Sequence, residues 1–162
     1  MSAERPMAAH IGAVLAEQQA VVSLLMKRLQ ATDYASVAAA ESCAGALFSH
    51  LRVIERLVLP ALSASKSLQG TQAAVRMVAA QLAAAVGEQE RTGSMASYAE
   101  LQASVPLLFL AEGLLLRDAS KTALPAASAS LAQQAEEQFI LLMGSADFNH
   151  IRQSIADDGT AP

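Results

Sequence analysis

The chain has 162 residues and a formal net charge of −4 at pH 7, a size that suits one domain burying about two-thirds of the surface of its unfolded chain. Its basic residues are scattered and its pI is near 5.3, which argues against the basic patches that bind nucleic acid or anionic membranes. Hydrophobic residues make up 53% and aromatic residues only 4%, and this alanine-rich composition favours packed helices over strands.

The chain lacks the sequence signals of export and of membrane insertion. Its first ten residues, MSAERPMAAH, contain Glu4 and do not follow the basic-then-apolar order of a signal peptide. Glu112 interrupts the most apolar run, so no window reaches about 18 uninterrupted apolar residues. A lone cysteine, Cys43, excludes an intrachain disulfide and a zinc site made of thiolates. We therefore expect a soluble, cytoplasmic protein that binds neither nucleic acid nor membranes.

Two long helices are predicted in the first part of the chain. The first runs from about residue 6 to 30, with Pro6 in its first turn, where a missing N–H costs nothing. Thr32 and Asp33 offer an N-cap for the second helix, which we expect over residues 34–59. Along this helix, spacings of three and four residues define one inward row, as left-handed bundle packing requires. The row consists of Ala40, Cys43, Leu47, His50, Ile54, Leu57 and Ala61.

The rest of the chain predicts a second hairpin and a helical extension. Pro106 should kink or split the second helix of this hairpin, because proline lacks an N–H and crowds the preceding turn. The expected elements are a linker over 63–70, a helix over 71–86, a turn over 87–94, a helix over 95–122, a fifth helix over 130–143 and a short amphipathic helix around 148–155.

Two hairpins with short connections predict an all-α fold, an up-and-down four-helix bundle with a C-terminal helical extension. We expect one domain over residues 1–162, with the bundle core over 7–123. The helical appendage then covers 126–157, and a polar tail over 158–162 is expected to be disordered.

A histidine, a glutamate and a proline distinguish the second helix. The run HLRVIERLVLP extends from His50 to Pro60, and His10 stands forty residues before His50. In this spacing the chain resembles the first half of a hemerythrin-like (HHE-type cation-binding) domain, and the resemblance extends over residues 7–123. It implies a bundle of hemerythrin-like type and, where the family pattern is complete, a di-iron centre held by histidines and carboxylates.

The chain departs from that pattern at most ligand positions. The family's bridging carboxylate belongs four residues after the second histidine, where this chain has Ile54 with Glu55 beside it. The third helix supplies no histidine near its start. The fourth has Leu107 where a histidine belongs, followed by Glu112. The usual di-iron ligand set is therefore incomplete.

Four residues are candidates for a reduced, mononuclear iron, manganese or zinc site: His10, His50, Glu55 and Glu112. The hairpin register brings His10 within about one turn of His50, and imidazole and carboxylate ligands suit these metals. The competing interpretation is a packed His50, hydrogen-bonded locally or to His10 or Glu112, in a protein without a cofactor. Glu112 is then an exposed or groove-facing charge or, as the next interpretation, makes a buried polar contact, and His150 is expected at the surface.

Catalytic groups are not assembled in the sequence. Cys43 and His50 are two helical turns apart, about 10 Å along one helix, which is too far for a nucleophile and its base. Neither GxGxxG nor GxxxxGK[ST] occurs, so no phosphate-binding loop is predicted. We therefore predict that the protein is not an enzyme.

The helix segment from Val105 to Leu116 is apolar on every side apart from Glu112. Such a helix is either covered by the fifth helix or forms an interface, and we expect a homodimer through it. Two hypotheses for function follow. The first is a non-enzymatic interaction, regulatory or small-ligand-binding module that has lost most di-iron ligands. The alternative is a reduced metal site that handles or senses dioxygen or a related small molecule.

Overall fold

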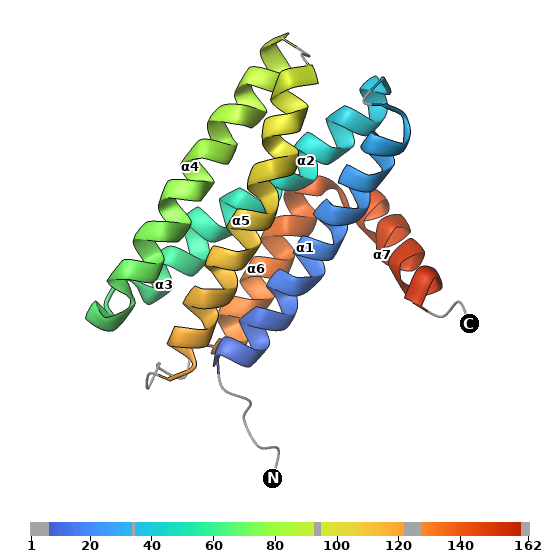
Figure 1. The fold of residues 1–162 in the computed structure, drawn as a ribbon. Coiled ribbons are helices and arrows are strands. Elements are labelled where there is room, and N and C mark those ends of the chain that lie inside the picture. Colours follow the sequence, from blue (N-terminus) through green and yellow to red (C-terminus); the bar gives the residue numbers. More distant parts are fainter. Residues whose placement is uncertain (1–6, 34, 93–94, 122–127, 160–162) are drawn as a thin grey trace.

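The computed structural model describes residues 7–33, 35–92, 95–121 and 128–159, and their regular structure is entirely helical (Figure 1). The all-α fold class is thereby confirmed. The elements are α1 (Met7–Ala31), α2 (Val37–Val53), a π-helical turn (Ile54–Val58), α3 (Leu59–Leu62), a 3₁₀ turn (Lys66–Leu68), α4 (Gln69–Thr92), α5 (Met95–Ala119), α6 (Ser128–Met143) and α7 (Ser145–Gly159).

The helices form two groups that share one core. The long antiparallel hairpin of α4 and α5 makes the first group, and α1, α2 and α6 pack against one another in the second (Figure 1). α5 joins the groups through α1, and α4 joins them through α2. Helix α7 turns away from the end of α6 and contacts α1.

Helix α6 belongs to the bundle, whereas the sequence placed it in an appendage. It packs on both α1 and α2 and buries one face, made of Leu131, Ala132, Ala135 and Phe139. The apolar spacing of residues 130–143 is the same as that of a core helix. The sequence pattern alone therefore does not tell which helices receive this face.

Local signals explain where the first two helices end and begin. Asp33 has a positive φ of 51°, which stops α1, and the hydroxyl of Thr32 donates to the Leu29 carbonyl at 2.8 Å. Ser36, rather than Thr32 or Asp33, caps α2 by accepting a hydrogen bond from the Ala39 N–H at 3.2 Å. The predicted cap was therefore a few residues early.

The two prolines inside helical segments have different effects. Before Pro60, the backbone widens into the π-helical turn, in which the Leu59 N–H bonds to the Ile54 carbonyl. The wider turn accommodates the proline ring, which in an α-helix would press on the carbonyl of Arg56. Pro106, in contrast, lies on the exposed face of α5 and does not split that helix.

Three segments are more helical than the sequence indicated. α4 extends from Gln69 to Thr92 and so absorbs most of the turn expected over 87–94. The 3₁₀ turn and the start of α4 occupy much of the expected linker over 63–70. α7 continues to Gly159, into the tail expected to be disordered, and residues 160–162 lie outside the described part.

The continuous helical run from Val37 to Leu62 is long and apolar enough to cross a membrane, judged by length and composition alone. Within its most apolar window, 56% is buried inside the fold. A core helix of a soluble protein passes the same test, because its apolar face is covered by other helices. Where the protein resides in the cell stays a prediction.

Cys43 lies on the buried face of α2, and this burial raises the pKa of its thiol from 9.0 to about 11. A raised thiol pKa means that the folded protein keeps the proton at neutral pH, so that little thiolate is present. Two pKa units correspond to about a hundredfold less thiolate at pH 8.

We predict that a disulfide exchange reagent such as DTNB modifies native Cys43 at least about a hundredfold more slowly than an unfolded cysteine at the same pH. The matched control is Ser42→Cys in a Cys43→Ala background, because position 42 is exposed on the same helix. Equal reaction rates for the two folded proteins would contradict a buried, protonated thiol.

Candidate functional site

A buried histidine lies at the centre of the bundle. His50, on α2, has 0% of its surface exposed and contacts polar side chains on both of its nitrogens. Its Nδ1 lies 2.8 Å from Oε1 of Gln18 on α1. Its Nε2 lies 2.7 Å from Oε1 of Glu112 on α5. Three helices thus meet at one imidazole.

The polar contacts continue on either side of this imidazole. The Gln18 side-chain amide donates to the backbone carbonyl of Ala135 on α6, at 3.2 Å. The Gln19 amide donates to Oε2 of Glu112 at 2.9 Å. We name Gln18, Gln19, His50 and Glu112 the polar network. With the Ala135 carbonyl, this network connects α1, α2, α5 and α6.

The hydrogen bonds determine where most of the protons lie. Because the Gln18 NH₂ group donates to Ala135, its oxygen faces His50, and the Nδ1 of His50 must carry a proton. Nε2 of His50 and Oε1 of Glu112 lie 2.7 Å apart, and within the described residues neither atom has a hydrogen-bond partner elsewhere. One proton therefore lies between them, in an imidazolium–carboxylate pair or in an imidazole–carboxylic acid pair.

Apolar side chains surround the polar network. The ring of Phe109 meets the His50 ring edge-on, with 6.0 Å between their centroids and 86° between their planes. Ile54, one turn beyond His50, is buried in the core. In such surroundings an unpaired polar group is costly, so each member of the network depends on its partner.

The structure brings two of the four metal candidates together, namely His50 and Glu112. Glu112 is only 1% exposed, so the interpretation of an exposed or groove-facing charge is wrong. Glu55 is 43% exposed and faces Arg52 at 3.7 Å on the surface. His10 lies in the first turns of α1, and its side chain is outside the described part.

The structure also shows where other polar side chains near the site or in the predictions lie. Gln72 on α4 is also buried, and its side-chain amide donates to the backbone carbonyl of Leu62 at 2.7 Å. His150 is exposed, as expected. The sequence reasoning missed Gln18 and Gln19. A signal for Gln18 was present, because a glutamine between the core positions Leu15 and Val22 interrupts the apolar face of α1.

The described donors do not fit the di-iron centre that the resemblance implies. No group of three or more histidine, cysteine, aspartate or glutamate side chains in the described residues is arranged to hold a metal ion. Both nitrogens of His50 and both carboxylate oxygens of Glu112 already have protein partners. A di-iron centre needs several histidines and carboxylates with free lone pairs on facing helices.

Comparisons with known proteins do not assign this chain to a family. No family model matches it, and neither the curated proteins nor the solved structures contain a significant match. The resemblance to hemerythrin-like domains thus rests on the residues from His10 to Pro60 alone.

We predict that His50 and Glu112 are energetically coupled. Replacing either one alone with leucine should cost about 3–5 kcal/mol of unfolding free energy, because the other is left buried without its partner. The double variant should cost clearly less than the sum of the two single variants. Urea unfolding of the four proteins measures this coupling.

A cycle between His50→Leu and Cys43→Ala is the control, since these positions are two helical turns apart and share no hydrogen bond. Its effects should add within about 0.5 kcal/mol. Additive effects of His50→Leu and Glu112→Leu would show that the pair does not act as a unit.

Proposed function

We propose that this protein is a non-enzymatic interaction module, a helical bundle of hemerythrin-like ancestry that binds a second copy of itself through the outer face of α5. The observation that carries the proposal is a row of exposed leucines on that helix. Leu107, Leu110 and Leu114 are 54%, 62% and 37% exposed.

The three leucines form one continuous surface. Their spacings of three and four residues place them on the same side of α5, and the small exposed residues Pro106 and Gly113 lie beside them. We name Leu107, Leu110 and Leu114 the α5 face. Helix α6, expected as one cover for this helix, packs on α1 and α2 instead. A contiguous apolar surface of this kind typically marks an interface in a soluble protein.

The α5 face is self-complementary in an antiparallel arrangement. In a dimer with twofold symmetry, the same surface of both copies meets, and residues pair reciprocally. If Leu110 lies at the axis, Leu107 of one copy meets Leu114 of the other. In the same register Glu100 of one copy comes near Lys121 of the other, which lies just beyond α5 and pairs with Asp118 at 3.7 Å, and both side chains are exposed. Shape and charge therefore favour a second copy as the partner.

The polar network supports a structural rather than a catalytic role for His50. Gln18 contacts one nitrogen of His50, Glu112 lies 2.7 Å from the other, and Gln19 donates to the second carboxylate oxygen of Glu112. A general base requires a lone pair within reach of a substrate. The only cysteine is held as a buried thiol. These contacts favour a network that holds the helices in position.

We predict that Leu110→Asp converts a dimer into a folded monomer, because it places two carboxylates near the twofold axis of an apolar interface. Sedimentation equilibrium over a range of concentrations measures the mass, and circular dichroism confirms the helix content. Leu141→Asp is the matched control, since Leu141 is an exposed leucine on α6, outside the α5 face. A monomeric wild type, or an unchanged mass for Leu110→Asp, contradicts the proposal.

The antiparallel register has its own control in the same assay. Glu100→Lys and Lys121→Glu should each weaken the dimer, since like charges then face each other. The double variant restores opposite charges and should recover most of the affinity. If the double variant is no tighter than the single ones, the leucines dimerise in another register.

The second candidate function is a reduced mononuclear iron, manganese or zinc site, and the contact between His50 and Glu112 is the observation that favours it. We predict less than stoichiometric metal in protein purified without chelators or a histidine tag, because the donors of this pair are engaged. Elemental analysis after iron supplementation measures the content. One equivalent of metal, lost in a folded His50→Ala variant, would establish the second candidate in place of the first.

A further inference from the structure

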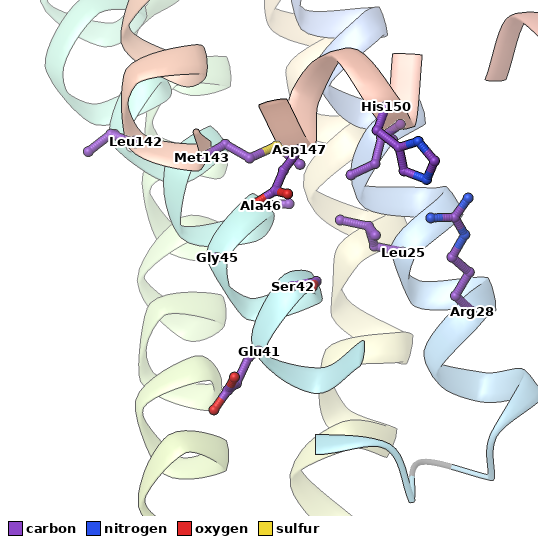
Figure 2. Close-up of a pocket in the computed structure, with 11 residues that line it drawn as sticks. Leu25, Arg28, Glu41, Ser42, Gly45, Ala46, Leu142, Met143, Asp147 and His150 are labelled. Carbon is purple, nitrogen blue, oxygen red and sulfur yellow. The ribbon is translucent and has the colours of Figure 1, made fainter. Parts of the chain in front are cut away.

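A cavity of about 360 Å³ lies between α1, α2 and the turn from α6 into α7 (Figure 2). Apolar side chains form part of its lining, among them Leu25 of α1, Met143 of α6 and Ile151 of α7. The cavity is separate from both the polar network and the α5 face. Its volume is in the range of small-molecule sites, about 300–1,000 Å³.

The position of α7 creates this cavity. Gly144, with a φ of 98°, ends α6 in a left-handed conformation that turns the chain into α7. Phe148 and Ile151 anchor α7 by burying their side chains, and the Phe148 ring packs edge-on against Phe139. Arg152 adds an ion pair with Glu17 of α1 at 2.6 Å. These anchors hold α7 across α1.

Four ionisable side chains from three helices surround the apolar part. They are Arg28 of α1, Glu41 of α2, and Asp147 and His150 of α7. Figure 2 shows Arg28 and His150 on one side of the cavity, while Asp147 extends over α2 near Ala46. Asp147 and His150 are the residues next to the anchors Phe148 and Ile151 in sequence. Burying the anchors therefore places both polar side chains at the rim.

No partner of these rim charges is found among the described residues. Within the described part of the chain, none of the four takes part in an ion pair or a side-chain hydrogen bond, although all four line the same cavity. A purely anionic ligand would meet Glu41 and Asp147, and a purely cationic one would meet Arg28. A ligand that carries one charge of each sign matches this rim.

We propose that the cavity binds a free α-amino acid with an apolar side chain. The carboxylate of the ligand pairs with the Arg28 guanidinium, a fork of donors that suits planar carboxylates, and accepts a hydrogen bond from His150. Its ammonium group pairs with Asp147. The apolar side chain packs on Leu25, Met143 and Ile151, where burial of apolar surface adds affinity.

Gly45 keeps the cavity open on the side of α2. A Cβ atom at this position would meet no other atom within 4 Å, so the space beside Gly45 is free. A larger side chain here fits the backbone and projects into the space that the ligand needs. The backbone accommodates the Cβ atom, so we expect Gly45→Leu to obstruct the cavity, and it replaces glycine by a better helix former.

The first experiment titrates the 162-residue chain with L-leucine, L-methionine and L-phenylalanine, followed by isothermal calorimetry and by chemical shifts of backbone amides. We expect saturable binding with shifts at residues 25–28, 41–46 and 143–151. N-acetylleucine, which lacks the ammonium charge, and leucinamide, which lacks the carboxylate, should bind about tenfold or more weakly, because each loses a charged hydrogen bond.

The second experiment compares matched variants by L-leucine titration. Arg28→Gln and Asp147→Asn should each weaken binding about tenfold or more, whereas Lys27→Gln, an exposed neighbour on α1, should not change it. Gly45→Leu should abolish binding. Gly87→Leu, at another open helix position, should raise stability in the same way and leave binding unchanged.

The proposal is overturned if none of the three amino acids binds at millimolar concentration, or if N-acetylleucine and leucinamide bind as well as leucine. It is also overturned if leucine still binds to folded Gly45→Leu. These outcomes are independent of the dimer proposal, since the cavity and the α5 face share no residue.

Discussion

The contact between His50 and Glu112 is the constraint on which the arrangement of the helices depends. Two ionisable side chains lie 2.7 Å apart in the interior, and each would be costly to bury without the other. The pair forms only when His50 on α2 and Glu112 on α5 face each other across the core in one register. Gln18 and Gln19 extend the same requirement to α1, and the Ala135 carbonyl extends it to α6. The apolar residues drive collapse, while this network distinguishes one register from its neighbours.

The same network explains why a chain that resembles a metal-binding domain in one helix holds its histidine differently. Ile54 occupies the position one turn beyond His50, and Glu55, the next residue, lies at the surface beside Arg52. The carboxylate that reaches His50 comes instead from α5, and glutamines occupy the remaining donors and acceptors. A shared proton and two amides thus satisfy the groups that a metal would otherwise coordinate.

The sequence predicted a module that binds a protein partner or a small ligand. In the structure, the surface proposed for the partner and the cavity proposed for the ligand lie in different places. Apolar residues on α5 point both ways, so that Leu108 and Leu115 fill the core while Leu107, Leu110 and Leu114 stay exposed. The cavity under α7 depends on a different set of contacts, the burial of Phe148 and Ile151 and the glycine turn at residue 144. The proposed interface on α5 and the proposed ligand site under α7 therefore share no side chain.

The sequence by itself determined the helical class, the approximate bounds of most helices and the burial of His50, because periodicity, proline and capping residues act over a few neighbouring positions. It did not determine the partner of His50, the role of Gln18 or the place of α6, which only the tertiary structure decided. The spacing of apolar residues states which face of a helix is buried and not which helix covers it. Glu112 looked like a surface charge for the same reason: its burial depends on a histidine sixty-two positions earlier in the chain.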